Sequence, residues 1–530
     1  MAGSETTPTR IALAVCFSVG AVTVLAPLFA IAFFEPPFAV QSDVSLLSEI
    51  SDPWILGLLA SSLKLAFYTT VLSLAVGVPL GLRLAAGSGP FVGALGLAHL
   101  LPLSLPPYIV GLGIASLTGT GGLLARFAGA RVGAAASEWL YCEAGVVFVL
   151  AVSLSPIITL STALFARGLN PRLVEAALNM RRPGAVLARI AVPLIAPGIL
   201  LGALVVFVFA FSEVAVPQLL GLKVYATAVF TRLADLSFEP AVAIARSLPP
   251  VTIAAIATVG LYLIDRHGRS SSGFKSALPD SLLGGVPGVF AGIVLVMAAA
   301  TAVLPVAALF LTATLAPGGG VSAFLEGSSA LINSLGYAFT SASVMLVIAI
   351  PSAWAWSRHP RAGSLASMPL LLGFLVPAAV LGTGLIVMWN RPETQWIYQG
   401  GGIMVLGFAA RYAFLPTRAI KLGFDRSVTS RHEAARLFEA SGIRRFFKIS
   451  VMGNSDAIMG GFVIAFLACF RDLDTVVLFY PPGGETLSVR TMTIEANAPP
   501  GQTAANAALQ VATTALMAIT AYLLLKGKKK

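Results

Sequence analysis

Four charged residues interrupt apolar stretches that are long enough to lie inside a membrane. They are Glu213, Arg471, Asp472 and Asp474. A charge at bilayer depth costs about 2.5–3.5 kcal/mol even on insertion scales, so these side chains should face a bundle interior or water. One interpretation is a polar ring at the gate of a translocation pathway. The other is an internal ion pair of Arg471 with a neighbouring carboxylate that only fixes helix packing, and the sequence leaves both open.

The residue types that catalyse reactions or hold metals are scattered along the chain. Cys16, Cys142 and Cys469 form no CxxC pair or Cys/His cluster. His99 lies in an apolar run, which favours a packing role over a ligand role. No GxxxxGK[ST] phosphate loop occurs, so the chain itself has no nucleotide site. We therefore expect no catalytic residue, no metal site and no cofactor bound by this chain, and a membrane enzyme is disfavoured.

A long basic segment at residues 170–192 reads as two short helices with a break between them. Asn170 can cap the first helix, with Pro171 at its first position. The pair Pro183 and Gly184 predicts the break. The first helix contains the consecutive residues Glu175, Ala176 and Ala177.

A second segment of the same kind occupies residues 430–452. Ser430 and Glu433 have the spacing of a capping box, and Ser441 with Gly442 supplies the break. Its matching residues are Glu433, Ala434 and Ala435.

Glu-Ala-Ala followed by a glycine turn in such a loop resembles the integral-membrane subunits of binding-protein-dependent ABC importers. In that family the loop is a coupling helix that docks in a groove of an ATPase subunit. Two copies in one chain resemble the fused permeases of the iron(III) and thiamine type, over nearly the whole length. The resemblance implies the type I importer permease fold. It also implies that both segments, with Gly184 and Gly442 at their turns, couple to the ATPase.

The elements that must position these residues are membrane-spanning helices. The chain is 57% hydrophobic and 11% charged, and its apolar runs reach the roughly 20 residues that a helix needs to cross a bilayer. Short alternating segments typical of a β-barrel do not occur. We predict an all-α polytopic membrane protein with twelve spans, at 11–34, 57–86, 91–117, 144–166, 193–216, 241–264, 286–315, 331–356, 366–389, 401–420, 457–480 and 504–526.

The distribution of basic residues predicts the orientation. Lysine and arginine accumulate in cytoplasmic loops. With the N-terminus inside, most of the 34 lysines and arginines fall on the cytoplasmic side. The outside loops hold only Arg126, Arg131, Lys223, Arg232, Arg391 and Arg490. Both termini are therefore predicted to be cytoplasmic, and the net charge of +11 needs no nucleic-acid partner. The resemblance to ABC importer permeases implies the inner membrane of a bacterium.

The two halves of the chain repeat in parallel. Ser62-Leu63 with Pro79 recurs as Ser334-Leu335 with Pro351, displaced by 272 residues. Pro106 with Gly111 and Gly113 recurs as Pro377 with Gly382 and Gly384, and aligning Phe211 with Phe470 sets Glu213 opposite Asp472. We predict one six-helix repeat at 1–270, a cytoplasmic linker at 271–285 and a second six-helix repeat at 286–530.

The sequence thus predicts a permease subunit, not an ATPase. Its expected partners are two copies of a cytoplasmic ABC ATPase that uses ATP and magnesium, an extracytoplasmic solute-binding protein and membrane lipid. The stretch from Arg471 to Arg490 resembles the corresponding part of fused ferric-iron permeases, which favours ferric iron. Thiamine and polyamines stay open, because carboxylates alone do not separate these cations. A secondary transporter with six helices in each half is the competing class.

Overall fold

The computed structural model describes residues 3–33, 45–87, 90–233, 239–267, 279–283, 286–426 and 446–527, and every regular element in these ranges is a helix. The first half contains α1 (Gly3–Gly20), α2 (Ala26–Phe33), α3 (Leu46–Ile50), α4 (Pro53–Ala86), α5 (Pro90–Leu100), α6 (Pro107–Thr118), α7 (Leu123–Ala128), α8 (Ala130–Leu140), α9 (Glu143–Ala166), α10 (Pro171–Met180), α11 (Pro183–Val186), α12 (Val192–Ser212), α13 (Ala215–Leu219), α14 (Tyr225–Leu233) and α15 (Pro240–His267). The second half contains α16 (Val286–Leu315), α17 (Val321–Glu326), α18 (Ser328–Arg358), α19 (Pro360–Ala366), α20 (Met368–Leu375), α21 (Ala378–Trp389), α22 (Gln395–Gln399), α23 (Gly402–Tyr412), α24 (Phe414–Arg426), α27 (Ser455–Phe470), α28 (Leu487–Glu495) and α29 (Pro500–Gly527).

The helices confirm the predicted all-α polytopic class. Within the described ranges ten helices are long and apolar enough to cross a membrane, or up to twelve if each of two bent pairs is one span. The bent pairs are α20 with α21, at 113°, and α23 with α24, at 51°. The predicted run 401–420 is therefore two helices, and its bend falls beside Ala413.

The third span of each half is broken at a proline, so the continuous spans predicted at 91–117 and 366–389 are wrong. In the first half α5 leads into a short 3-10 turn, η2 (Leu101–Ser104), and α6 begins after Pro106. In the second half α20 ends before the corresponding Pro377. The two prolines adopt nearly the same backbone angles, φ −57° and ψ 140° against φ −54° and ψ 138°. Proline removes a helix donor and forces the preceding residue into an extended conformation, while both flanking pieces stay apolar.

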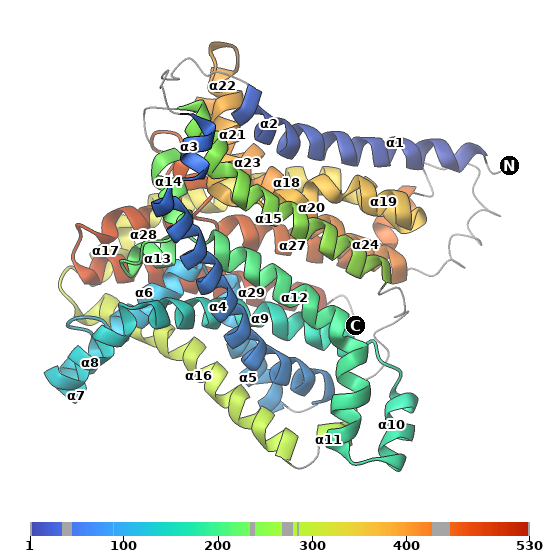
Figure 1. The fold of residues 1–530 in the computed structure, drawn as a ribbon, viewed down its shortest axis with the longest axis horizontal. Coiled ribbons are helices and arrows are strands. Elements are labelled where there is room, and N and C mark those ends of the chain that lie inside the picture. The colour runs from blue at the N-terminus through green and yellow to red at the C-terminus, as the bar shows by residue number, and fades with distance from the viewer. Residues whose placement is uncertain are drawn as a thin grey trace.

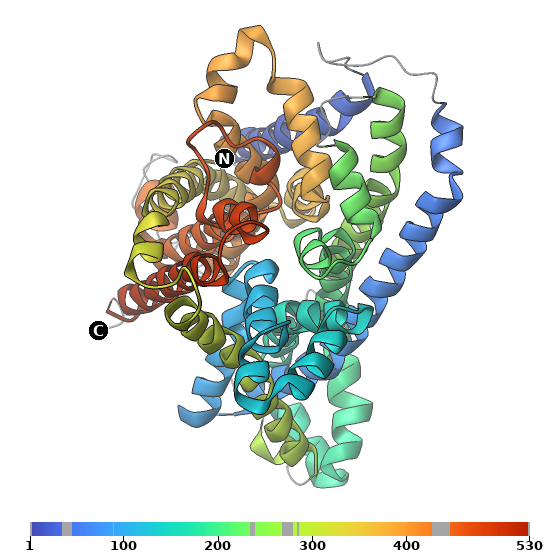
Figure 2. The same ribbon diagram turned by 90° about the vertical axis from the view of Figure 1, so that its left-hand side faces the viewer.

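The first helix of each half packs on the other half (Figures 1 and 2). Helix α1 contacts α18 and α20, and α2 contacts α21, whereas α16 contacts α4, α5 and α6. A Cβ atom on Gly384 would lie 2.3 Å from the Pro27 carbonyl oxygen, and one on Gly113 would lie 2.7 Å from the Pro305 carbonyl oxygen. Only glycine permits such backbone approach, so the repeated Gly-x-Gly pair marks the two crossing points.

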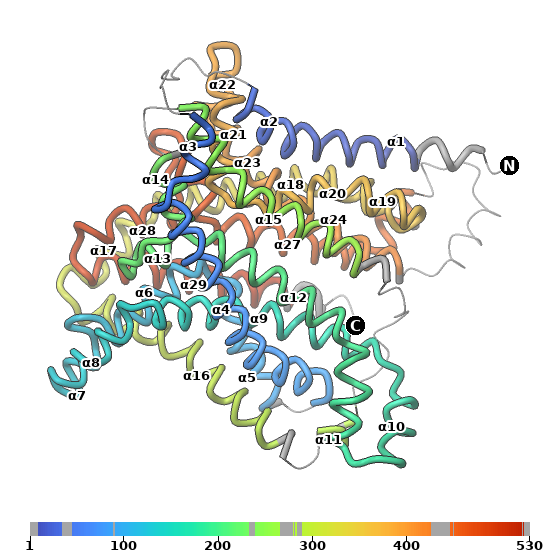
Figure 3. Tube along the Cα trace, viewed as in Figure 1, coloured from blue at the N-terminus to red at the C-terminus, as the bar shows by residue number. Residues whose placement is uncertain are grey.

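Different elements lie at the two ends of the helix bundle. Both chain ends and α10 lie toward the right-hand end of the molecule in Figure 1, while α7, α8, α17 and α28 lie at the opposite end. The tube in Figure 3 follows the same path and shows α10 and α11 projecting from the bundle. The loop that connects the fourth and fifth spans of the first half is therefore on the side of the termini.

Candidate functional site

A cavity of about 530 Å³ lies between the two halves. Its wall comes from η2, α6, α9 and α12 of the first half and from α20, α23, α24 and α27 of the second. Most of the lining is apolar. The charged lining residues are Glu213, Arg411, Arg471, Asp472 and Asp474. The structure thus brings together all four charged residues singled out in the sequence and adds Arg411.

Glu213 and Asp472 occupy the same place relative to a helix end. Helix α12 ends at Ser212 and α27 at Phe470, earlier than the predicted spans 193–216 and 457–480. Beyond each end the carboxylate accepts a hydrogen bond from the backbone N–H three residues later, Val216 for Glu213 at 3.3 Å and Thr475 for Asp472 at 2.9 Å. A carboxylate that caps the next turn in this way competes with continuation of the helix, which explains the early ends.

Asp472 is the best-connected carboxylate of the cavity. Besides the Thr475 N–H, it accepts a hydrogen bond from the Thr475 hydroxyl at 2.7 Å and from the Tyr412 hydroxyl at 2.5 Å. The Arg411 Nε atom lies 3.8 Å from Asp472 Oδ2. The Asp472 side chain is 2% exposed, so this cluster compensates a charge that is almost fully removed from solvent.

The two arginines bind the backbone at the broken third spans. Arg411 Nη1 donates to the Val376 carbonyl oxygen at 2.9 Å, directly before Pro377. Arg471 Nη1 donates to the Leu103 carbonyl oxygen in η2, which belongs to the other half. Helix breaks leave carbonyl groups without intrahelical donors, and a guanidinium can satisfy them. The ion pair of Arg471 with a carboxylate, one of the two predicted alternatives, is not formed within 4 Å among the described residues.

Arg411 and Tyr412 are site residues that sequence reasoning missed. Arg411 lies inside the predicted span 401–420, and a charge within an apolar run was the available signal. Its role depends on Asp472, which is 61 residues further along the chain, and no sequence motif links the two. Tyr412 gives still less signal, because a tyrosine in an apolar helix is common.

The first coupling segment begins with the predicted short helix, α10. The predicted second short helix is wrong, because α11 continues without a break through residues 187–191 into α12, so that residues 183–212 form one candidate span. The Asn170 side chain accepts a hydrogen bond from the Arg172 N–H at 3.1 Å, and Pro171 opens α10, as predicted. Glu175, Ala176 and Gly184 are exposed and Ala177 is partly buried. The break falls at Arg181 and Arg182, not at Pro183 and Gly184, because Pro183 suits the first position of α11.

The linker between the halves packs on this segment. Its residues 280–283 form a short 3-10 turn, η4, and Leu282 and Leu283 are buried against Val174 of α10 and Val186 of α11. The rest of the linker and the second coupling segment up to residue 445 lie outside the described residues, including Glu433, Ala434, Ala435 and Gly442. Their predicted coupling role is therefore untested.

The histidine and cysteines singled out in the sequence lie in separate places among the described residues. No three His, Cys, Asp or Glu side chains converge on a possible metal site in the part of the chain that is described. His99 is buried and its Nε2 lies 2.9 Å from the Thr159 hydroxyl, in keeping with a packing role. Cys16 and Cys469 are buried and unpaired, and Cys142 is unpaired and exposed.

Comparison with known proteins decides the class. No family model matches the chain. The molybdenum transport system permease protein ModB of Mycobacterium tuberculosis is 32% identical over 213 residues, which are 38% of this chain and 76% of ModB. This chain belongs to the ABC transporter permeases. It is thus the membrane-spanning subunit of an ABC importer, a multi-pass protein of the bacterial inner membrane, and a secondary transporter is excluded.

The permease is also similar to ferric permeases over both of its halves. The putative ferric transport system permease protein FbpB 1 of Haemophilus influenzae is 23% identical over 464 residues, 83% of this chain and 72% of the relative. The ferric transport system permease protein FbpB of Actinobacillus pleuropneumoniae is 22% identical over 467 residues, 83% of this chain and 66% of the relative. Such alignments are longer than one half, consistent with a fused two-half permease of the iron type.

Proposed function

We propose that this permease carries ferric iron through the cavity between its halves and is driven by separate ATPase subunits. The observation that carries the proposal is the charge of the cavity wall. Three carboxylates and two guanidinium groups give it one formal negative charge. A wall with this charge favours a cation over an anion. The similarity to the FbpB permeases over both halves supports iron among the possible cations.

The proposed coupling element is α10 with its counterpart at 430–452. Helix α10 is largely exposed, with Leu173 48% and Met180 84% exposed, and Val174 is its one buried residue. Exposed apolar residues beside Glu175 suit docking into a groove of a partner. Two ATPase subunits, one for each coupling segment, would bind ATP and magnesium, since the permease sequence contains no phosphate loop. A solute-binding protein would deliver the solute at the opposite end.

The division of the chain follows from the same proposal. The first repeat is assigned to 1–270 and the second to 286–530, joined by the linker at 271–285 on the ATPase side. Each repeat would contribute one coupling segment and one wall of the cavity. Membrane lipid surrounds the bundle, and no nucleic acid is involved.

Import of an oxyanion is the second candidate, favoured by the 32% identity to ModB and by the two cavity arginines. Thiamine and polyamines are further cationic solutes. Uptake of radiolabelled ferric iron and of radiolabelled molybdate, measured in cells with and without the permease gene, separates these candidates. ATP-dependent iron uptake that requires the permease is the expected result. Uptake of molybdate with no iron uptake would overturn the iron assignment and leave the permease assignment intact.

A further inference from the structure

We propose that Glu213 and Asp474 are the two cavity residues that contact the solute and select a cation, whereas Asp472, Arg411 and Arg471 hold the cavity wall in place. This inference rests on the proposed function, because it assigns a solute contact within the same cavity. Two of the five charged side chains are thus available to a solute, and the other three already bind groups of the protein.

Asp472 is engaged because both of its carboxylate oxygens already accept hydrogen bonds from the protein. One oxygen accepts the Thr475 N–H, and the other accepts the hydroxyls of Thr475 and Tyr412. The adjacent Arg411 guanidinium supplies the opposite charge. A solute that bound this carboxylate would have to displace these contacts, which is costly in a site that is nearly closed to water.

The arginines are engaged because each satisfies a backbone carbonyl at a helix break. Arg411 holds the Val376 carbonyl within its own half, and Arg471 reaches across the cavity to the Leu103 carbonyl of the other half. Releasing either guanidinium would leave a carbonyl without a donor in the membrane interior, where an unsatisfied polar group is costly. These contacts explain why two cations line a cavity that we expect to accept a cation.

Glu213 and Asp474 are the carboxylates that remain. Glu213 is 8% exposed, and the only hydrogen bond it makes within the described chain is the 3.3 Å bond from the Val216 N–H to Oε1. Asp474 is partly exposed on the cavity wall and makes no hydrogen bond or ion pair with the residues that the structure describes. The two come from opposite halves and line the same cavity. A cation between them would be favoured by both negative charges.

The chemistry of this pair suits a hard cation held briefly. Carboxylate oxygens are the ligands that hard metal ions prefer. Two carboxylates without a third protein ligand leave most of the coordination shell of a ferric ion to water or to a carried chelator. A pathway needs binding that is weak enough for the solute to leave, so an incomplete set of ligands fits passage better than storage.

The test compares three carboxylate variants in the full permease with its ATPase. Concentration-dependent uptake of ferric iron, supplied as its citrate complex, is measured for wild type, Glu213→Gln, Asp474→Asn and Asp474→Glu. Loss of one charged contact should raise KM for iron about 10-fold to 100-fold, while Asp474→Glu retains the charge and stays near wild type. The matched control is Asp456→Asn, which removes an exposed carboxylate at the start of α27. Asp474 follows the other end of that helix, and Asp456 does not line the cavity. It should leave KM unchanged.

Each result has a defined meaning. If the wild type imports iron and the KM values of Glu213→Gln and Asp474→Asn stay within about twofold of wild type, this inference is overturned. The proposed function would then still stand. Wild type that imports no iron would overturn the proposed function itself. Thermal unfolding of each purified variant is recorded in parallel. Because Asp474 bonds to nothing described in the protein, Asp474→Asn should unfold no earlier than wild type, and loss of folded protein would also contradict the inference.

Discussion

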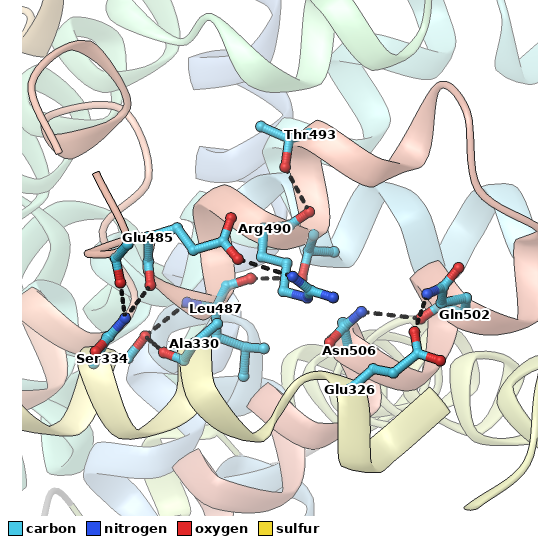
Figure 4. Close-up of polar contacts among 12 residues, drawn as sticks. Glu326, Ala330, Ser334, Glu485, Leu487, Arg490, Thr493, Gln502 and Asn506 are labelled. Carbon is cyan, nitrogen blue, oxygen red and sulfur yellow. Dashed lines mark hydrogen bonds and ion pairs between the residues drawn. The ribbon is translucent and has the colours of Figure 1, made fainter. Parts of the chain in front are cut away.

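Ser62 and Ser334 make the same contact in the two halves of the permease. The Ser62 hydroxyl accepts a hydrogen bond from the Tyr225 N–H at 2.8 Å, and the Ser334 hydroxyl accepts one from the Leu487 N–H at 2.7 Å. Tyr225 and Leu487 are the first residues of α14 and α28, and Figure 4 shows Ser334 beneath the start of α28. The second span of each half thus binds an otherwise unsatisfied amide at a helix start.

Ser334→Ala and Ser62→Ala should each destabilise the permease by about 1–3 kcal/mol, because each leaves a buried N–H without an acceptor. Thermal unfolding of the purified permease measures the effect. Ser61→Ala is the control, since Ser61 is exposed and lies next to Ser62 on α4. Equal melting temperatures for Ser62→Ala and Ser61→Ala would show that the amide contact is unimportant.

Gly384→Ala and Gly113→Ala should weaken the packing of the crossed first helices. The added methyl group would meet the carbonyl oxygen of Pro27 or Pro305, and overpacking of this kind costs about 1–3 kcal/mol. Lower melting temperatures and faster proteolysis of the variants are the expected readouts. Gly336→Ala on α18 is the control because a Cβ atom there meets open space. A stable Gly384→Ala variant would argue against the close crossing of α2 and α21.

Asp472→Asn should destabilise the permease by about 3–5 kcal/mol, because it removes the one carboxylate that lies within 4 Å of the Arg411 guanidinium among the described residues, at a site with little exposure. Chemical or thermal unfolding in detergent measures this loss. The double variant Asp472→Asn with Arg411→Gln should recover part of it, since the uncompensated charge is then also removed. Additive effects of the two substitutions would contradict a coupled pair.

Glu175→Lys should release the ATPase subunit from the permease. A charge reversal in a docked interface costs more than about 2 kcal/mol of binding free energy. At an ATPase concentration near the wild-type dissociation constant, this lowers the fraction of permease with bound ATPase at least about tenfold. Co-purification with the ATPase and the ATPase rate in the complex report the effect. Glu138→Lys is the matched control, because Glu138 is exposed on α8 at the opposite end of the molecule. Retained ATPase binding by Glu175→Lys would remove α10 from the interface.

Leu282→Asp should weaken the coupling to the ATPase although the sequence of α10 is unchanged. Leu282 is fully buried against α10 and α11, and a charge there would expel the linker from its apolar contact. The expected result is a lower solute-stimulated ATPase rate in a permease that still inserts in the membrane. If stimulation were unchanged, the linker would be a passive connector.

Local signals in the sequence determined the class of the fold and much of the coupling segment. The length of the apolar runs predicted the spans, and the 272-residue displacement of Ser62 and Ser334 predicted halves that make equivalent contacts. Asn170 and Pro171 placed the start of α10 correctly. These predictions are correct because the length of an apolar run and the capping of a helix are local properties of the sequence.

Only the tertiary structure decided which charged residues bind protein groups, which face the cavity, and where the membrane-spanning helices break. Arg471 finds its partner at Leu103 and Arg411 at Val376, and both carbonyls are free because helices stop before Pro106 and Pro377. The first helices of each half, α1 with α2 and α16, pack on the opposite half. This packing likewise depends on backbone contacts such as that of Gly384 with Pro27. The reason is physical: in an apolar bundle, packing between residues far apart in sequence chooses which polar groups are paired and which, such as Asp474, are left facing the cavity.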